Sequence, residues 1–118
     1  MDQTTDEPVE TELHPLFQAC IDANLSKVIE LLPGNENIRN ENGWTLLHFT
    51  ACRTSNIKDR MKIIDILVEK GLNINQRTTV GPYDPPLYKG HSPKDMAPFY
   101  VGDEVNPIRL CIEIHGGF

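Results

Sequence analysis

The stretch "NENGWTLLHFTACRTSNIKDRMKIIDILVEKGLNIN", residues 40–75, sets out one complete structural unit. It begins with "NENG", where Asn and Gly suit the positive φ of a tight turn. A short helix is expected around Leu46 to Arg53, followed by a longer helix that Asp59 caps at its start and Gly71 ends in a left-handed conformation. One broad face of the longer helix is apolar and is made by Ile63, Ile64, Ile66, Leu67 and Val68. The stretch therefore predicts a turn, two helices and a closing turn.

This unit resembles the ankyrin repeat, in which a turn glycine and a Thr-Pro-Leu-His run open the first of two helices. The matching residues are Gly43, Thr45, Leu47, His48 and Ala51, and "GLNIN" at residues 71–75 forms the exit. The sequence departs from the pattern at Leu46, where proline is usual, and at Thr50, where alanine is usual. About five additional residues near "TSNIK" lengthen the turn between the helices.

Two further copies follow from the same template. The upstream copy has His14, Pro15 and Leu16 in the Thr-Pro-Leu positions, Ala19 and Cys20 in the two small positions, and "ANLSKVIELL" as turn and second helix. The downstream copy begins with Gly90, Ser92, Pro93 and Ala97, and its second helix carries Ile108, Leu110, Cys111 and Ile112 and ends at Gly116. In this copy Lys94 takes the usual leucine position, and Pro98 and Pro107 restrict both helices.

The resemblance implies an all-α fold, an ankyrin-repeat solenoid of helix-turn-helix units joined by β-hairpin-like loops. It covers residues 13–117, with repeats at approximately 13–39, 40–75 and 76–117, the third with an enlarged loop at 76–90. About three stacked units are the minimum that buries the apolar faces. The final segment, "PIRLCIEIHGGF", is mostly apolar, whereas a terminal repeat needs a polar outer face. Two alternatives stay open: the chain is part of a longer repeat protein, or a partner covers its end.

The net charge of -6 is concentrated at the start of the chain. Residues 1–12 contain five acids and no Lys or Arg, which predicts an acidic, flexible tail. The chain does not cluster the basic residues that phosphate groups need, so direct binding to nucleic acid or to a membrane is not expected. No apolar run resembles a signal peptide or a membrane span. With three widely spaced cysteines, these features predict an intracellular protein, cytoplasmic, nuclear or both.

The sequence offers few side chains that could bind a metal or act as a catalytic nucleophile. His48 and Cys52 are four residues apart on an expected helix, a spacing that zinc ligands use, but no second cluster supplies the remaining ligands. The ankyrin resemblance implies instead a structural role for His48, whose ring bonds the backbone of the neighbouring hairpin. Cys20 and Cys111 fall at core positions, so a cysteine nucleophile is not expected. The sequence therefore predicts a protein that is not an enzyme and that needs no metal or cofactor.

Ankyrin arrays bind other proteins on a concave groove made by hairpin tips and the exposed face of the first helices. Carried over to this chain, the resemblance implies a protein-binding site at Glu41, Asn42, Trp44, Cys52, Arg53, Ile21 and Asp22. Trp44 is the most informative of these, because a tryptophan beside a turn glycine should be partly exposed and Trp is frequent in binding hot spots. The alternative is that its indole packs on the next hairpin.

The segment between the second and third copies, residues 76–88, is longer than a hairpin finger needs, and long ordered loops are usually functional. Ser92-Pro93, which follows it, is interpreted as a helix start. Within the finger, the binding residues predicted are Tyr83, Pro85, Pro86 and Tyr88. The last four residues, "PPLY", resemble the P-P-x-Y ligand of WW domains, since adjacent prolines favour the polyproline conformation. A finger that shapes the groove and a passive insertion are the alternatives.

The function expected is that of a protein-protein interaction module, an adaptor or inhibitor whose partner is a protein or peptide of unknown identity. A second interpretation is a scaffold that displays the P-P-x-Y ligand. A third resembles small viral or insect ankyrin proteins that mimic inhibitors of the NF-κB family and sequester a transcription factor. The repeat frame does not distinguish these, because binding depends on surface residues.

Overall fold

The computed structural model describes residues 14–79 and 90–117 of the chain, and within them it is mostly helical. Six helices and one two-stranded sheet follow in the order α1 (Pro15–Ile21), α2 (Leu25–Leu31), α3 (Leu46–Ala51), α4 (Ile57–Glu69), α5 (Pro93–Met96), β1 (Tyr100–Val101), β2 (Glu104–Val105) and α6 (Pro107–Ile114). The expected helices are therefore present, and the small sheet is an addition that the sequence did not suggest.

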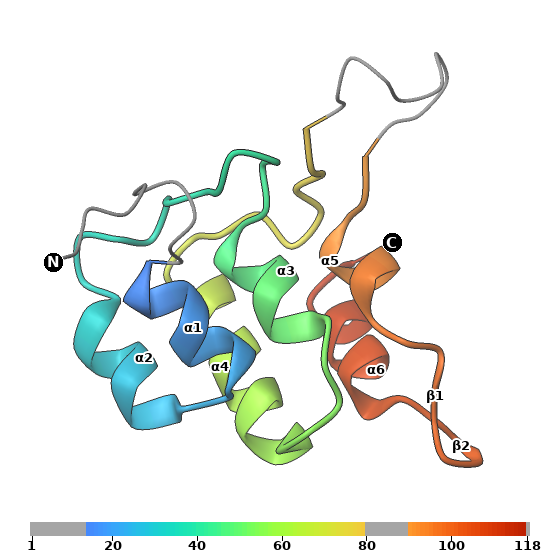
Figure 1. Ribbon diagram of the computed structural model, residues 1–118. Coiled ribbons are helices and arrows are strands. Elements are labelled where there is room, and N and C mark those ends of the chain that lie inside the picture. Colours follow the sequence, from blue (N-terminus) through green and yellow to red (C-terminus); the bar gives the residue numbers. More distant parts are fainter. Residues whose placement is uncertain (1–13, 80–89, 118) are drawn as a thin grey trace, which may run out of the picture.

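Consecutive helices pack as pairs: α1 with α2, α3 with α4, and α5 with α6. The first members of the pairs contact one another in the order α1, α3, α5, and the second members in the order α2, α4, α6 (Figure 1). The pairs thus form two layers of helices, and the turns that enter α3 and α5 lie at the same end of the molecule (Figure 1).

One continuous core lies between these layers. In α4 the predicted apolar face is present, because Ile63, Ile64 and Leu67 are fully buried and Ile66 and Val68 pack against the core while half-buried. Buried apolar side chains also come from α1, α2, α3 and α6, among them Leu16, Val28, Leu47 and Ile112. No single pair of helices could bury such a face alone, so the three pairs stabilise one another.

A side chain accepts a main-chain hydrogen bond at the start of the first helix of each pair. At α3, Thr45 and His48 form a capping box, and at α5, Ser92 and Asp95 do the same. At α1, the Nδ1 atom of His14 accepts a hydrogen bond from the Leu16 N–H at 3.1 Å. These side chains satisfy amides that have no partner within the helix. The prediction that Ser92-Pro93 starts a helix is confirmed, with Ser92 at the N-cap and proline in the first turn.

The start of α4 differs from its prediction. The helix begins at Ile57, with Asn56 as N-cap at φ 51°, so Asp59 lies inside the first turn and is not the cap. The longer connection after α3 turns back through this left-handed Asn, which asparagine tolerates better than most residues. The carboxylate of Asp59 still lies where negative charge favours a helix. The end of the helix is as predicted, because Gly71 has φ 97°.

The third pair is connected by the small hairpin. Pro98 follows the short α5, and Pro107 occupies the first turn of α6, so both prolines bound helices as expected. Between them β1 and β2 pair antiparallel, with Tyr100 opposite Val105. Buried Asn106 joins this hairpin to the next helix: its Nδ2 donates to the Pro98 carbonyl at 2.8 Å, and its Oδ1 accepts from the Ile108 N–H at 3.0 Å.

The longest described helix, α4, has 13 residues. Within residues 14–79 and 90–117, no helix is therefore long and apolar enough to cross a bilayer.

Candidate protein-binding surface

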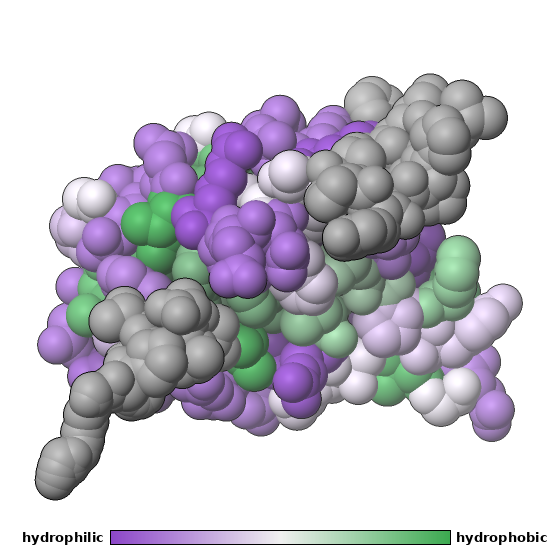
Figure 2. Space-filling model, turned by 45° about the horizontal axis from the view of Figure 1, so that its top comes forward, coloured by the Kyte–Doolittle hydropathy of each residue, from purple (hydrophilic) through white to green (hydrophobic). Residues whose placement is uncertain are grey.

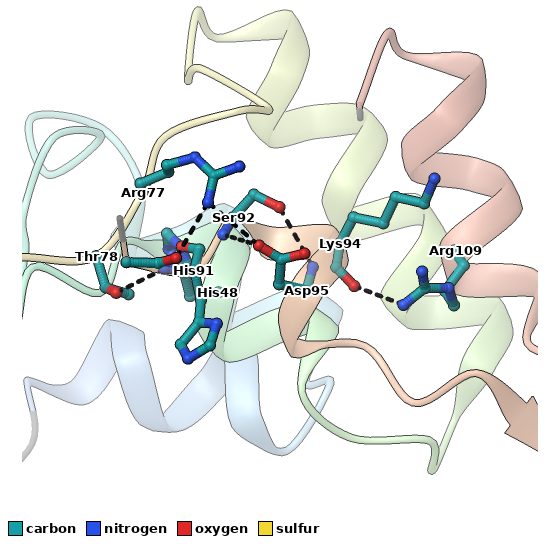
Figure 3. A network of polar contacts seen from close by, with 9 residues as sticks. His48, Arg77, Thr78, His91, Ser92, Lys94, Asp95 and Arg109 are labelled. Carbon is teal, nitrogen blue, oxygen red and sulfur yellow. Dashed lines mark hydrogen bonds and ion pairs between the residues drawn. The ribbon is translucent and has the colours of Figure 1, made fainter. Parts of the chain in front are cut away.

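The two chain segments that flank residues 80–89 are held together by a short network, which we call the finger base and define as Arg77, Thr78, Gly90 and His91 (Figure 3). The Thr78 N–H donates to the His91 carbonyl at 3.0 Å, and the His91 N–H donates to Thr78 Oγ1 at 2.9 Å. Arg77 donates to the Gly90 carbonyl at 3.0 Å. The entry and exit of this finger are thus fixed relative to each other.

His48 connects the finger base to α3. Its Nδ1 accepts from the Thr45 N–H at 3.0 Å, and its Nε2 contacts the His91 carbonyl at 2.8 Å, a bond to neighbouring hairpin backbone of the kind that the ankyrin resemblance implied. Because a carbonyl only accepts, Nε2 carries the proton and the ring is neutral. Burial holds the pKa of His48 below its ordinary value. Both ring nitrogens are therefore occupied, and His48 is not available as a metal ligand beside Cys52.

Two glycines permit neighbouring turns to approach closely. At Gly90, which has φ 79°, an added Cβ would lie 2.2 Å from the Thr78 carbonyl oxygen. At Gly43, with φ 77°, it would lie 2.3 Å from Thr79 Oγ1. The Thr79 N–H also donates to the Asn42 carbonyl at 2.9 Å, so the turn that precedes α3 is attached to the residue that follows the finger base residue Thr78.

The predicted binding residues of the described part fall into two groups at opposite ends of the first helices. Glu41 and Asn42 are exposed in the turn before α3, and Trp44 follows them half-buried. The other group comprises Ile21, Asp22, Cys52 and Arg53. The expectation that Cys52 and Arg53 lie on the middle first helix is wrong: α3 ends at Ala51, so Cys52 is the C-cap and Arg53 lies in the longer connection beyond it.

Trp44 packs on α3, the helix that begins two residues after it. Its ring centroid lies 4.9 Å from that of Phe49 and 6.2 Å from that of His48, and Phe49 in turn lies 4.6 Å from Phe17 of α1. The indole is thus partly exposed, as expected, and among the described residues its ring contacts are with His48 and Phe49 of α3. All six residues of α3 are buried, so exposed groups are found at the ends of this helix and not along it. Figure 2 shows hydrophobic residues lying among hydrophilic ones on the face turned forward.

The finger residues Tyr83, Pro85, Pro86 and Tyr88 lie outside the described residues, as do residues 1–12 of the predicted acidic tail. Their predicted roles as part of the groove or as a P-P-x-Y ligand stay predictions.

A buried arginine organises the other end of the first helices, and the sequence analysis missed it. Arg60 of α4 is fully buried, and its guanidinium donates to the carbonyls of Cys20 and Ile21 at the end of α1, of Thr50 near the end of α3, and to Ser55. These carbonyls carry the negative end of each helix dipole. One sequence signal could have indicated this role: an arginine near the start of a second helix, followed mainly by apolar residues.

Arg109 plays the same part in the third pair. From the first turn of α6 it donates to the carbonyls of Lys94 and Ala97, both at 2.8 Å, at the end of α5 (Figure 3). Its guanidinium carbon also lies 4.1 Å from the ring centroid of Phe99. In the part of the chain that the structure describes, arginines of second helices therefore fix the ends of first helices twice, which keeps the predicted binding residues beside those ends in defined positions.

The thiols give little support for nucleophilic chemistry. Burial raises the pKa of Cys20 to about 11. Burial and the neighbouring Asp65 carboxylate raise the pKa of Cys111 to about 11 as well. Both are thiols at neutral pH, and the thiolate is the nucleophilic form. Sequence reasoning overlooked that Cys111 of α6 and His115, its C-cap, are four residues apart and that Asp65 of α4 lies beside both.

Neither a scan against protein-family models nor a search of curated proteins finds a match for this sequence.

Proposed function

We propose that the chain is an ankyrin-type protein-binding module that recognises a protein or peptide through the turn before α3, the finger base and the C-terminal ends of the first helices. The observation that carries the proposal is the repeated arrangement of three helix pairs, in which first helices contact first helices and second helices contact second helices. Capping boxes begin both α3 and α5, and the side chain of His14 caps α1. Such stacked pairs with projecting turns are the architecture that repeat proteins use for binding.

The fixed geometry of the turns supports a binding role. Thr79 bonds to Asn42, Thr78 bonds to His91, and His48 bonds to the same His91 carbonyl, so adjacent turns form one connected surface. A surface that is ordered before it meets a partner loses less conformational entropy on binding. Glu41 and Asn42 lie exposed on it, and the aromatic edge of Trp44 adjoins them.

The proposed surface also has a second contact region. The six residues of α3 rise about 9 Å, which places Arg53 and Asp22 within the reach of a peptide that begins near Trp44. Charged groups of both signs stand there, together with half-buried Ile21 and Cys52. This mixture suits a partner with an apolar anchor and flanking charges, because hot spots combine aromatic or arginine groups with a surrounding rim.

The test is capture from cell extract on the immobilised full chain, followed by mass spectrometry. The double variant Asn42→Arg, Arg53→Glu changes exposed groups of both regions, and Lys62→Glu on α4 is the control for a charge reversal at an exposed position outside them. A partner that the wild type and Lys62→Glu retain, and that the double variant loses by about tenfold or more, supports the proposal. Thermal unfolding of each variant verifies that its fold is intact.

Two outcomes would contradict binding at the proposed surface. A partner that all three proteins retain equally does not bind at these residues. A partner that is lost with Tyr88→Ala and retained by the double variant binds the P-P-x-Y segment, and the helices then only support a linear ligand.

A further inference from the structure

A mixed cluster of ligand-forming side chains lies between α4 and α6, away from the proposed binding surface. Asp65 Oδ1 is 2.6 Å from His115 Nε2 and 3.7 Å from Cys111 Sγ. One ligand atom of each residue lies within 4.8 Å of the others. Asp65 is exposed, His115 is half-buried and Cys111 is almost fully buried. A thiol, an imidazole and a carboxylate thus converge where the second members of two helix pairs meet.

We propose that Asp65, Cys111 and His115 form a binding site for Zn²⁺. Cysteine sulfur, histidine nitrogen and carboxylate oxygen are the three donor types that zinc uses in proteins. Cys111 lies in the last turn of α6, His115 is the C-cap four residues further on, and Asp65 approaches from α4. A thiolate together with an imidazole favours zinc over magnesium or calcium, which prefer oxygen ligands alone.

The distances suit a tetrahedral ion. With zinc about 2.3 Å from sulfur and about 2.0–2.1 Å from nitrogen or oxygen, two ligand atoms on one ion are about 3.3–3.6 Å apart. The separation of Cys111 from Asp65 is already close to this value. The separation of Asp65 from His115 has to widen by less than about 1 Å, and the ion replaces the hydrogen that joins them. The proton displaced from between Asp65 and His115 and the proton that leaves the Cys111 thiol both go to solvent.

Three protein ligands leave one position of the ion open. A hollow of about 460 Å³ adjoins the cluster and is lined by Asp65, Cys111 and His115 together with Met61, Pro107, Leu110 and Ile114. It gives a water molecule or another small ligand access to the fourth position. Three protein ligands and an open position are the arrangement found where zinc has a task beyond holding the fold.

The inference does not depend on the proposed protein-binding function, and a metal titration tests it. Chelator-treated, reduced full chain is titrated with Co²⁺, which replaces zinc and absorbs visible light. We expect one equivalent of Co²⁺ to produce the bands of a tetrahedral ion and a sulfur-to-cobalt charge-transfer band, both abolished by Zn²⁺. Zn²⁺ should also raise the unfolding temperature, because binding to the folded state alone stabilises it.

Variants identify the ligands. Cys111→Ser should abolish the charge-transfer band, and Asp65→Asn or His115→Gln should weaken Co²⁺ binding by more than about tenfold, since even outer-shell partners contribute 10- to 100-fold. Cys52→Ser, a half-buried thiol at the end of α3, is the matched control and should keep the full spectrum. Asp65 is exposed, so its variant remains folded and informative if Cys111→Ser does not fold.

The proposal is overturned by any of three results: no saturable Co²⁺ binding, bound Co²⁺ without the sulfur band, or a spectrum that survives in Cys111→Ser and Asp65→Asn. In each case the cluster is only a hydrogen-bonded Asp65–His115 pair with a neighbouring thiol.

Discussion

At the scale of single residues, Arg60 has a large structural role that the sequence analysis did not predict. Its charged group is fully buried, and every hydrogen bond in which it takes part goes to a main-chain carbonyl or to Ser55. A buried cation is costly unless its donors are satisfied, and here the carbonyl ends of two helices satisfy them. One side chain of α4 therefore joins α1 to α3.

Arg60→Ala should destabilise the protein strongly. It leaves the carbonyls of Cys20, Ile21 and Thr50 without this donor and opens a cavity, and we expect a loss of about 3 kcal/mol or more in the free energy of unfolding. Urea denaturation measures this quantity. Lys62→Ala, an exposed position of the same helix, should stay within about 0.5 kcal/mol of wild type. Similar midpoints for the two variants would refute the role of Arg60.

His48 should make stability depend on pH. In the unfolded chain it takes up a proton near its ordinary pKa of 6.5, whereas burial, the largest influence, lowers the pKa of the folded state. Protonation of Nδ1 would also prevent it from accepting the Thr45 N–H. Stability should therefore be full above about pH 6.5 and fall as the pH drops through the folded pKa, by at most about 1.4 kcal/mol per pH unit.

The measurement is the urea midpoint of wild type and His48→Asn between pH 7.5 and about pH 4.5, a range that brackets the ordinary histidine pKa. The variant should be less stable at neutral pH and should show a flatter pH dependence. Asp95 should contribute little to the slope in this range in either protein. Partial burial raises its pKa, but hydrogen bonds from Ser92 and the charge of Arg77 outweigh this and leave the pKa lowered. Its contribution is lost only at more acidic pH, near and below 3.8. Parallel curves for the two proteins would show that His48 does not cause the slope.

At the scale of elements, the finger base should be sensitive to its glycine. Gly90→Ala places a Cβ 2.2 Å from the Thr78 carbonyl oxygen and forces alanine to adopt φ 79°. We expect destabilisation of more than about 2 kcal/mol, the sum of the left-handed penalty and displacement of the finger. Thermal unfolding monitored by circular dichroism measures it.

Gly102→Ala is the control for this prediction. Gly102 also has positive φ, 63°, but an added Cβ there meets nothing within 4 Å. It should therefore show the conformational penalty alone, about 1–2 kcal/mol. Equal losses at the two positions would mean that the close approach between Gly90 and Thr78 has no energetic importance.

The elements also show where sequence reasoning succeeds. Caps and prolines are local signals, so Ser92-Pro93, Gly71 and Pro107 marked helix limits correctly. Asp59 was misassigned because Asn56, in a left-handed conformation, starts the helix earlier. The two-residue strands of β1 and β2 are too short to produce an alternating pattern, and they are held by Asn106, whose burial follows only from the packing of α5 and α6.

Tertiary contacts explain what sequence could not provide at the site. The spacing of Cys111 and His115 was visible, but Asp65 joins them only because α4 packs against α6. In the same way, the partial exposure of Trp44 was predictable from the turn glycine, whereas its support by Phe49 required the fold. The buried state of Arg60 depends on carbonyls about 40 residues away in the chain.

At the scale of the whole molecule, unfolding should be a single cooperative transition. The core runs without interruption through all three pairs, and no pair buries its own face. Trp44 is the only tryptophan, so its fluorescence reports on the packing beside α3, while far-ultraviolet circular dichroism reports on all helices. We expect both signals to give the same urea midpoint and the same slope. Separate midpoints would show that a pair unfolds on its own.

Because Arg60 bonds almost wholly to the main chain, its contacts place few demands on the identity of the residues that receive them. Any amino acid at positions 20, 21 or 50 offers the same carbonyl oxygen, so these positions are free to exchange within the limits of volume, whereas position 60 is not. Such a joint preserves the stacking of helices while their sequences diverge. Chains whose sequences differ widely can therefore keep this architecture.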